Sequence, residues 1–358
     1  MTECLIFDDN YSLMNSTFSG NFSPQTPNDK IENLKFIAYG IFSSIIIGLG
    51  ILGNLINLFV LTRPSLKGIT FVYLTWLAIS DLMSMLTSVS SLLRLLGIQP
   101  KTYLAAIYYA HIEIPLVNAF MASSVFIVVA LTVDRYFSVC LPTRFKEVHN
   151  IQRARRSITA AYICAFSLYI PVCFQKRPCL FNFNSTVEYG FYDNLNVVDH
   201  AAYKFYLLVK EIIVRLGPAL LLTILNITII LTLRKTLKKR QDRLDISSGG
   251  LLPSNIRCRE KQRLCILLTG IIILFIVSMV PAAILTLLNG DDKEFHFGFQ
   301  LFRAFANIME LSNYAVNFYV YCTCSSEIRK TFTALVATHI LNESSPSSKP
   351  SLVSNSKF

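Results

Sequence analysis

The sequence is poor in charged residues and has a single tryptophan. Only 15% of its 358 residues are charged, whereas 53% are hydrophobic, and Trp76 is the one tryptophan. An ordinary soluble domain carries about 25% charged residues. This chain lacks the polar side chains needed to cover a water-facing surface, which argues against two or three soluble domains. Lipid is therefore the expected solvent for much of the chain.

Cysteine motifs are also missing. The nine cysteines include no CxxC pair and no cluster with histidine, which argues against a metal centre. Only Cys4, Cys173 and Cys179 are expected to meet an oxidising compartment, because the others lie in apolar runs or near basic loops. The spacing leaves open whether Cys179 pairs with Cys4, with Cys173 or with neither.

The net charge of +11 does not indicate a nucleic-acid partner. A DNA-binding domain gathers its cations on one folded face, whereas here they lie between long apolar runs. Each run is long enough for a helix across a bilayer, and backbone groups in lipid must be satisfied within the segment. The seven runs lie between residues 35 and 63, 67 and 94, 113 and 134, 156 and 176, 215 and 234, 263 and 291, and 303 and 327.

Glycosylation sequons and basic loops predict the same orientation. The sequons are at Asn10, Asn15, Asn21 and Asn184, and seven spans place all four on one side. The densest cations, between residues 234 and 263, fall on the other side, which the positive-inside rule assigns to the cytoplasm. We expect a multi-pass plasma-membrane protein with an extracellular N-terminus. Its first helix would act as an uncleaved anchor, because residues 1–33 lack a signal-peptide core.

The expected fold class is all-α, with a seven-transmembrane helix bundle over residues 34–323. Polar residues 1–33 and the serine-rich tail 341–358 are expected to be disordered. Between residues 324 and 340, Ile328, Phe332 and Leu335 recur at helical spacing. This pattern predicts a short amphipathic helix along the cytoplasmic membrane surface.

Polar residues inside the spans are the candidate functional groups. A charge at the bilayer midplane costs about 3 kcal/mol, so Asp81 in the second span needs an explanation. Asn54, Ser124, Asn313 and Asn317 also lie inside spans. A single Asn or Ser commonly does no more than link two helices, but that does not explain a lone carboxylate. We expect a hydrated polar pocket inside the bundle.

Short motifs recur at a characteristic depth in six of the spans. They are Gly53-Asn54, Leu77-Ala78 with Asp81, Asp134-Arg135-Tyr136, Pro218, Phe275 with Pro281, and Asn317-Phe318-Tyr319-Val320-Tyr321. In this order, they make the chain resemble rhodopsin-like (class A) G-protein-coupled receptors over roughly residues 34–340. The resemblance implies a receptor and not an enzyme, and no span carries a nucleophile–base pair.

The resemblance also implies roles for individual residues. Asp81, Ser124, Asn313 and Asn317 match the positions that hold an allosteric sodium ion in this family, and no other cofactor is expected. Asp134, Arg135, Tyr136 and Tyr321 match positions of the G-protein-coupling surface. Pro218 and Pro281 remove backbone hydrogen bonds and are expected to let their helices bend.

Several positions depart from the family pattern. Phe318 replaces the proline of the seventh span, and Met279 stands where the family has a tryptophan. The helix-four tryptophan is absent, and Ala110 occupies the place of the cysteine that usually links the third span to the second outer loop. Lys261 replaces an acid that holds the arginine of the third span, although Glu260 is adjacent. These changes put the usual disulfide and the usual resting lock in doubt.

Two positions argue against known ligand classes, and two segments indicate another class. Val117 stands where amine receptors have an aspartate, and Leu311 where opsins have a lysine. The Asn-Phe-x-x-Tyr ending and the fifth span are similar to those of invertebrate FMRFamide-like neuropeptide receptors. A peptide ending in Arg-Phe-amide needs a carboxylate for its guanidinium. The candidate ligand-binding residues are Glu113, Glu310, Arg94, Glu211, Arg215 and Val117.

Other interpretations remain open. The acids and arginines of the candidate pocket would instead pair with one another to avoid unpaired charge in a dry bundle. One alternative function is that of a chemosensory receptor for an environmental small molecule. Another is that of a transporter or channel, although the sequence shows no inverted repeat. For a peptide receptor, the expected partners are the peptide, a heterotrimeric G protein, receptor kinases and arrestin at the tail serines, and the lipid bilayer.

Overall fold

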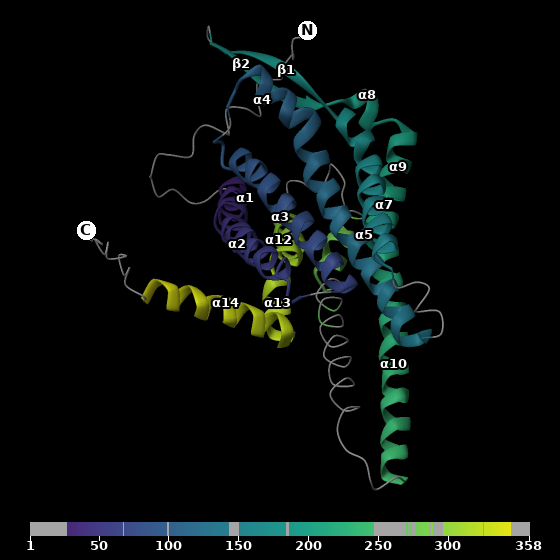
Figure 1. Ribbon diagram of the computed structural model, residues 1–358. Helices are drawn as coiled ribbons and strands as arrows, with labels where there is room; N and C mark the ends of the chain where they lie inside the picture. The colour runs from purple at the N-terminus through teal and green to yellow at the C-terminus, as the bar shows by residue number, and fades with distance from the viewer. Residues whose placement is uncertain are drawn as a thin grey trace, which may run out of the picture.

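The computed structural model describes residues 27–66, 68–98, 100–142, 150–183, 186–246, 277–285, 296–324 and 326–344, with residues 270, 273 and 288. In this part of the chain, long helices run roughly side by side and one β-hairpin caps one end (Figure 1). We call this the hairpin end. At the opposite end, α14 (Ser326–Ser344) leaves the bundle crosswise, and we call it the α14 end.

The element bounds follow the chain order. The first three long helical segments are α1 (Pro27–Lys35), η1 (Phe36–Ser43) and α2 (Ser44–Leu61); α3 (Ile69–Leu95); and α4 (Tyr103–Ile107), η2 (Tyr108–Ile112) and α5 (Glu113–Cys140). They are followed by α7 (Ile151–Tyr169), η3 (Ile170–Phe174), the strands β1 (Lys176–Phe183) and β2 (Thr186–Asp193), and α8 (Leu195–Val198). The remaining elements are α9 (Ala201–Glu211), η4 (Ile212–Leu216), α10 (Gly217–Ile246), α12 (Phe297–Ala315), α13 (Asn317–Cys324) and α14.

Five helical stretches in the described part are long and apolar enough to cross a membrane: Lys30–Leu61, Ile69–Arg94, Tyr103–Cys140, Ile151–Phe174 and Ala201–Thr236. Each overlaps one of the first five predicted spans, and the third and the fifth begin earlier than predicted, at Tyr103 and Ala201. Most of the sixth predicted span lies outside the described residues, although residues 277–285 are helical through Pro281. The seventh is divided into α12 and α13 by a bend at Val316.

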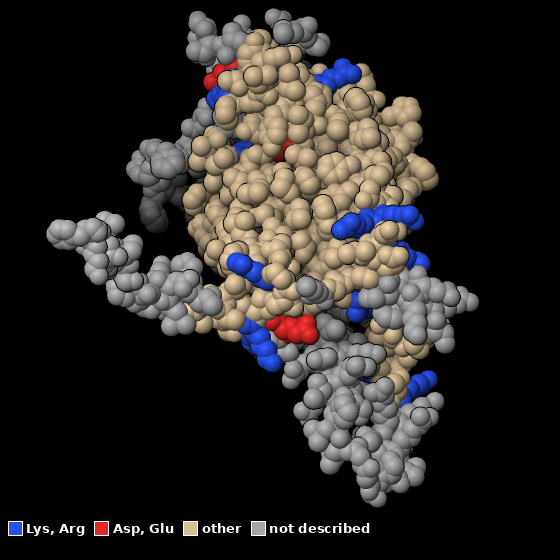
Figure 2. All heavy atoms as spheres, viewed as in Figure 1, with Lys and Arg blue, Asp and Glu red and all other residues tan. Residues whose placement is uncertain are grey.

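Large apolar side chains cover the outer faces of these helices. Leu220 is 66% exposed and Ile224 60%, and Leu52 and Phe59 of α2 are each 55% exposed. The visible face of the molecule is mostly uncharged across its middle, with Lys, Arg, Asp and Glu toward its two ends (Figure 2). Such a continuous apolar surface matches the hydrocarbon layer of a bilayer and is far larger than the apolar patches of soluble monomers.

The third span lies at the centre of the bundle. Its helix α5 packs against α3, α7 and α10, and α2 packs against α3 and α12. The buried core joins these helices through Leu77, Ile127, Leu131, Leu222 and Met279. This packing carries the polar residues of α3, α5 and α13 into the interior.

Two of the described π-helical segments are followed by a proline. In η2, the Glu113 N–H bonds to the Tyr108 carbonyl, and Pro115 follows. In η4, the Gly217 N–H bonds to the Ile212 carbonyl, and Pro218 follows. Proline has no N–H and its ring clashes with the carbonyl four residues earlier, so the helix accommodates it by widening one turn. The bend predicted at Pro218 therefore takes the form of a π turn.

The structure changes two predicted boundaries and adds one element that was not predicted. Residues 27–33 begin the first helix and are not disordered, because Pro27 is suited to the first position of a helix. The amphipathic helix extends to Ser344, four residues beyond its expected end at residue 340. The segment after η3 pairs into the antiparallel hairpin β1–β2, in which Cys179 faces Gly190. Cys4, Asn10, Asn15, Asn21, Asn184, Glu260 and Lys261 lie outside the described residues.

Candidate functional site

The carboxylate of Glu113 is completely buried at the hairpin end. Glu113 begins α5 and is 0% exposed, and Arg94 of α3 donates from Nε to its Oε2 at 2.8 Å. The Ser90 hydroxyl lies 3.4 Å from the other carboxylate oxygen and 2.9 Å from the Tyr108 hydroxyl. A buried carboxylate in this position is tolerated because a cation and a hydroxyl group satisfy it.

The hairpin places an aromatic ring beside this ion pair. Phe191 of β2 has the Lys176 ammonium 4.5 Å from its ring centroid and the Arg94 guanidinium carbon 5.8 Å away. The ring of Tyr109 is 6.2 Å from it. Burial lowers the pKa of Lys176, and Asp193, opposite Lys176 in the hairpin, acts against that shift. Phe191 is thus the link between the hairpin and the Arg94–Glu113 pair.

A second group of charges joins α9, η4 and α12. Arg215 donates from Nη2 to Glu310 Oε1 at 2.8 Å and also forms an ion pair with Glu211. Lys210 Nζ lies 3.3 Å from Glu211 Oε1 and 5.3 Å from the ring centroid of Tyr169. Two cations and two carboxylates balance each other here.

All but one of the candidate ligand residues therefore belong to these two charge clusters, and the acids and arginines pair with one another as the alternative interpretation expected. Val117 is buried in α5 but belongs to neither cluster. Cys173 carries a free thiol, and Cys179 is buried in β1.

The central cluster surrounds Asp81. Asp81 of α3 is 0% exposed; its Oδ1 accepts from the Ser124 hydroxyl at 2.6 Å and its Oδ2 from the Asn317 amide at 2.5 Å. Asn313 is buried one turn before Asn317, but in the described structure it makes no hydrogen bond to Asp81. Three of the four predicted sodium-site residues are thus in contact. Their carboxylate and hydroxyl oxygens are the ligand type that a hard cation prefers.

Sequence reasoning missed a buried amide in α2, that of Asn57. Asn54 donates at 3.0 Å to the carbonyls of both Gly50 and Tyr314. Asn57 lies one turn further along α2 and is 0% exposed, yet neither polar atom of its side chain has a hydrogen-bond partner among the described residues. The sequence signal that could have identified it is the pair Asn54 and Asn57, which are three residues apart in an apolar helix. A buried amide without a partner carries a desolvation cost of about 1–3 kcal/mol.

The third cluster lies at the α14 end, where α5 carries Asp134, Arg135 and Tyr136. Arg135 donates from Nη2 to Asp134 Oδ2 at 2.8 Å, while its Nε is buried with no partner in the described structure. The Tyr136 ring lies 6.0 Å from that of Phe137. Tyr321 lies in α13, but its side chain is outside the described set.

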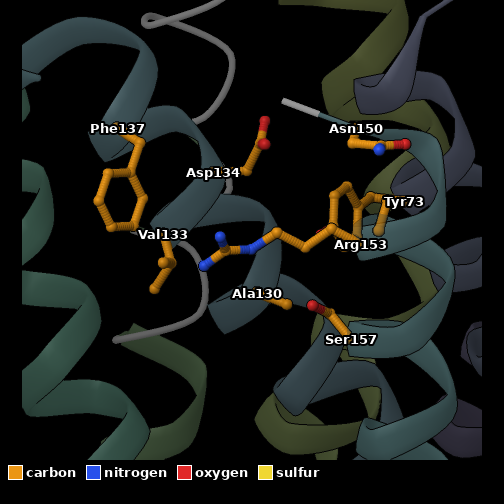
Figure 3. A pocket seen from close by; sticks show the side chains of 9 residues that line it. Tyr73, Ala130, Val133, Asp134, Phe137, Asn150, Arg153 and Ser157 are labelled. Carbon is orange, nitrogen blue, oxygen red and sulfur yellow. The ribbon is translucent and has the colours of Figure 1, made fainter. Parts of the chain in front are cut away.

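A pocket of about 140 Å³ opens beside Asp134 (Figure 3). Its lining residues come from α3, α5 and the start of α7: Tyr73, Ala130, Val133, Asp134, Phe137, Asn150, Arg153, Ala154 and Ser157. Asn150 caps α7 by accepting a hydrogen bond from the Gln152 N–H, and the helix then directs Arg153 into the pocket. Sequence reasoning missed Arg153 because its charge was counted only as part of a basic loop.

Comparisons with known proteins agree with this arrangement. The profile of the 7 transmembrane receptor (rhodopsin family) matches residues 53–324. A "Probable G-protein coupled receptor" of Caenorhabditis elegans is 33% identical over 320 residues, which cover 86% of this chain and 77% of that protein. A second nematode protein described in the same words is 32% identical over 306 residues, covering 83% and 68%. The "FMRFamide receptor" of Drosophila melanogaster is 24% identical over 349 residues, covering 91% and 58%.

The family match extends from the first span to the end of α13, and it includes both Asp81 and Arg135. Proteins of this family are multi-pass membrane receptors that signal through G proteins, and they are not enzymes. The chain therefore belongs to the rhodopsin family of seven-transmembrane G-protein-coupled receptors.

Proposed function

We propose that this receptor lies in the plasma membrane with its hairpin end outside and responds to an extracellular neuropeptide of the Arg-Phe-amide type. The observation that carries the proposal is the burial of Glu113 against Arg94 beneath the hairpin. A buried carboxylate with a guanidinium partner is already a site for one guanidinium. The printed name of the Drosophila relative, FMRFamide receptor, supports the same peptide class.

Binding would proceed by exchange of ion-pair partners. The guanidinium of the peptide replaces that of Arg94 at Glu113, or that of Arg215 at Glu310. The carboxylate is therefore paired with a guanidinium both before and after binding, and a guanidinium can donate two hydrogen bonds to it. The displaced arginine becomes available to the aromatic ring of the peptide, as Arg94 is now to Phe191. An apolar odorant would gain nothing from the buried carboxylate of Glu113 or the half-buried one of Glu310, which disfavours the chemosensory alternative.

At the opposite, cytoplasmic end, Asp134, Arg135, Tyr136 and Tyr321 would form the surface that meets the G protein. A sodium ion at Asp81 and Ser124 would favour the resting arrangement, since it would hold α3, α5 and α13 together. Tail serines in residues 345–358, which lie outside the described part, would be the sites for receptor kinases and arrestin.

The test replaces each candidate carboxylate with its amide. Glu113→Gln and Glu310→Gln are compared at matched surface expression, with FMRFamide and a panel of other amidated peptides, in cells carrying a promiscuous G-protein reporter. We expect at least a tenfold loss of potency, about 1.4 kcal/mol, for one or both variants.

Glu188→Gln is the matched control. Glu188 is an exposed carboxylate of the same hairpin, paired with Lys101 at 2.7 Å. Its replacement should leave potency unchanged. If dose–response curves of the Glu113 and Glu310 variants coincide with wild type, the peptide guanidinium does not bind these acids and the proposal fails.

A further inference from the structure

The charges around the ring of Phe191 do not balance in the part of the chain that the structure describes. Arg94 and Lys176 both lie beside this ring: the guanidinium carbon of Arg94 is 5.8 Å from its centroid, and the ammonium of Lys176 is 4.5 Å away. Glu113, which is completely buried, is paired with Arg94 at 2.8 Å. Two cations and one buried carboxylate therefore meet beneath the hairpin.

Lys176 takes part in no ion pair among the described residues. Asp193 lies opposite it in the hairpin, but Asp193 is exposed, and the two side chains are not within ion-pair distance. Lys176 is itself half-buried, and this burial lowers its pKa. The ring of Phe191 therefore holds an ammonium group whose desolvation is only partly offset.

The proposed exchange of ion-pair partners would increase this excess of positive charge. The guanidinium of the peptide replaces that of Arg94 at Glu113, and Arg94 stays nearby because it belongs to α3. Three cations would then lie close to one carboxylate, and like charges brought together in a binding site repel each other strongly. A peptide that carries its own carboxylate would remove the excess.

We infer that Lys176 binds a carboxylate of the ligand, so that the receptor selects amidated peptides with an aspartate or glutamate before the arginine. The acid must precede the arginine, because only a phenylalanine follows it and the amidated end carries no charge. Lys176 is then a residue that determines which members of the peptide class bind. The inference rests on the proposed function, and in particular on exchange at Glu113.

The positions of the two cations limit the spacing within the peptide. Since both are measured from the same ring centroid, the Arg94 guanidinium and the Lys176 ammonium lie at most about 10 Å apart, which an extended chain spans in about three residues. The peptide guanidinium would occupy the place of that of Arg94. We therefore expect the acid within about three residues before the arginine.

The experiment measures a preference between two peptides on one receptor. Acetylated five-residue peptides that end in Arg-Phe-amide carry either aspartate or asparagine at each of the three positions before the arginine, and acetylation removes the terminal ammonium group. Potency is read from a promiscuous G-protein reporter. At one position, the aspartate peptide should be about threefold to tenfold more potent than the asparagine peptide on wild type. This ratio does not depend on how much of a receptor variant folds.

Two variants of Lys176 and one control test the assignment. Lys176→Met should reduce the ratio to about one, whereas Lys176→Arg should keep most of the preference, because a cation is retained. Arg177→Met is the matched control and should leave the ratio unchanged. Arg177 is the next residue of β1 and is exposed, and neighbouring side chains of a strand point to opposite faces.

Asp193→Asn adds a readout that a merely structural lysine would not change. It removes the carboxylate opposite Lys176, so the preference for the aspartate peptide should increase. Equal potency of the aspartate and asparagine peptides at all three positions on wild type would overturn the inference. So would a preference that persists in Lys176→Met. Undiminished potency of the asparagine peptides on Glu113→Gln would instead contradict the guanidinium exchange, and with it the proposed function.

Discussion

Glu113 and Arg94 form an ion pair between α5 and α3 in which the carboxylate has no exposed surface and the arginine remains 21% exposed. The two partners differ in their access to solvent: the carboxylate depends on the arginine to balance its charge, whereas part of the arginine side chain reaches solvent. Ligand exchange at this site is feasible because the partner that would leave is the one nearer to solvent. The same asymmetry makes the pair important for folding.

We expect Arg94→Met to destabilise the receptor severely. The substitution keeps an apolar stem but leaves the Glu113 carboxylate buried without a cation, which costs about 3–5 kcal/mol. Thermal unfolding of purified receptor in detergent should show the loss, together with reduced surface expression. The double variant Arg94→Met/Glu113→Gln should recover much of the stability. A single variant as stable as wild type would mean that Glu113 is not ionised against Arg94.

Lys176 should make stability depend on pH in the alkaline range. Because its pKa in the folded protein is below the ordinary value of 10.5, the unfolded chain binds more protons between the two pKa values. Stability therefore rises with pH through that window, as the charged form that burial disfavours disappears. The stability of wild type minus that of Lys176→Met should increase as pH approaches 10.5 from below. A flat or falling difference would contradict the burial of this ammonium.

Asn57 and Asn54 should respond oppositely to the same substitution. Asn57→Leu removes an amide that has no partner in the described structure, so the receptor should gain about 1–3 kcal/mol of stability. Asn54→Leu removes two hydrogen bonds, one of them to the Tyr314 carbonyl across the bundle, and should be destabilising. Apparent melting temperatures of the two variants decide the matter. A loss in both would show that Asn57 has a partner in the membrane-embedded protein, such as bound water.

Arg135→Ala should reach the cell surface in near-normal amounts and fail to activate the G protein. Its side chain is 11% exposed at the α14 end, and its ion pair among the described residues is with the neighbouring residue of the same helix, so its removal breaks no described ion pair between helices. Surface labelling and reporter output, measured on the same cells, separate the two properties. Signalling at the wild-type level would remove Arg135 from the coupling surface.

The first five predicted spans depended on charge alone, and each of them overlaps a helical stretch that is long and apolar enough to cross a membrane. A bilayer excludes charge wherever it falls in the sequence, so the edges of each span are marked by residues such as Arg63 and Arg94. The family resemblance grouped Asp81 with Ser124, Asn313 and Asn317, and the structure brings Ser124 and Asn317 into contact with Asp81. The sodium ion itself stays a prediction.

The ion-pair partners at the hairpin end could not be predicted from the sequence. Helical periodicity does not reveal which helix an acid will face, so Glu113 and Arg94 remained candidates for a ligand or for each other. The hairpin depends on pairing across a turn, and the cations beside Phe191 meet only after β1 and β2 have formed. Arg153 belongs to no motif, and its position in the pocket beside Asp134 is seen only in the structure.

The widened turns η2 and η4 alter how positions in this receptor correspond to those of its relatives. Each turn accommodates about one additional residue, and one residue in a helix corresponds to about 100° of rotation. Gly217 permits this in η4, since a Cβ there would meet the Ile212 carbonyl oxygen at 2.9 Å. In a homologue that lacks the proline or the glycine, the counterparts of Glu211 and Arg215 would therefore point in different directions even where the aligned letters are identical. Ligand contacts should be transferred between such receptors only after the phase of these helices has been compared.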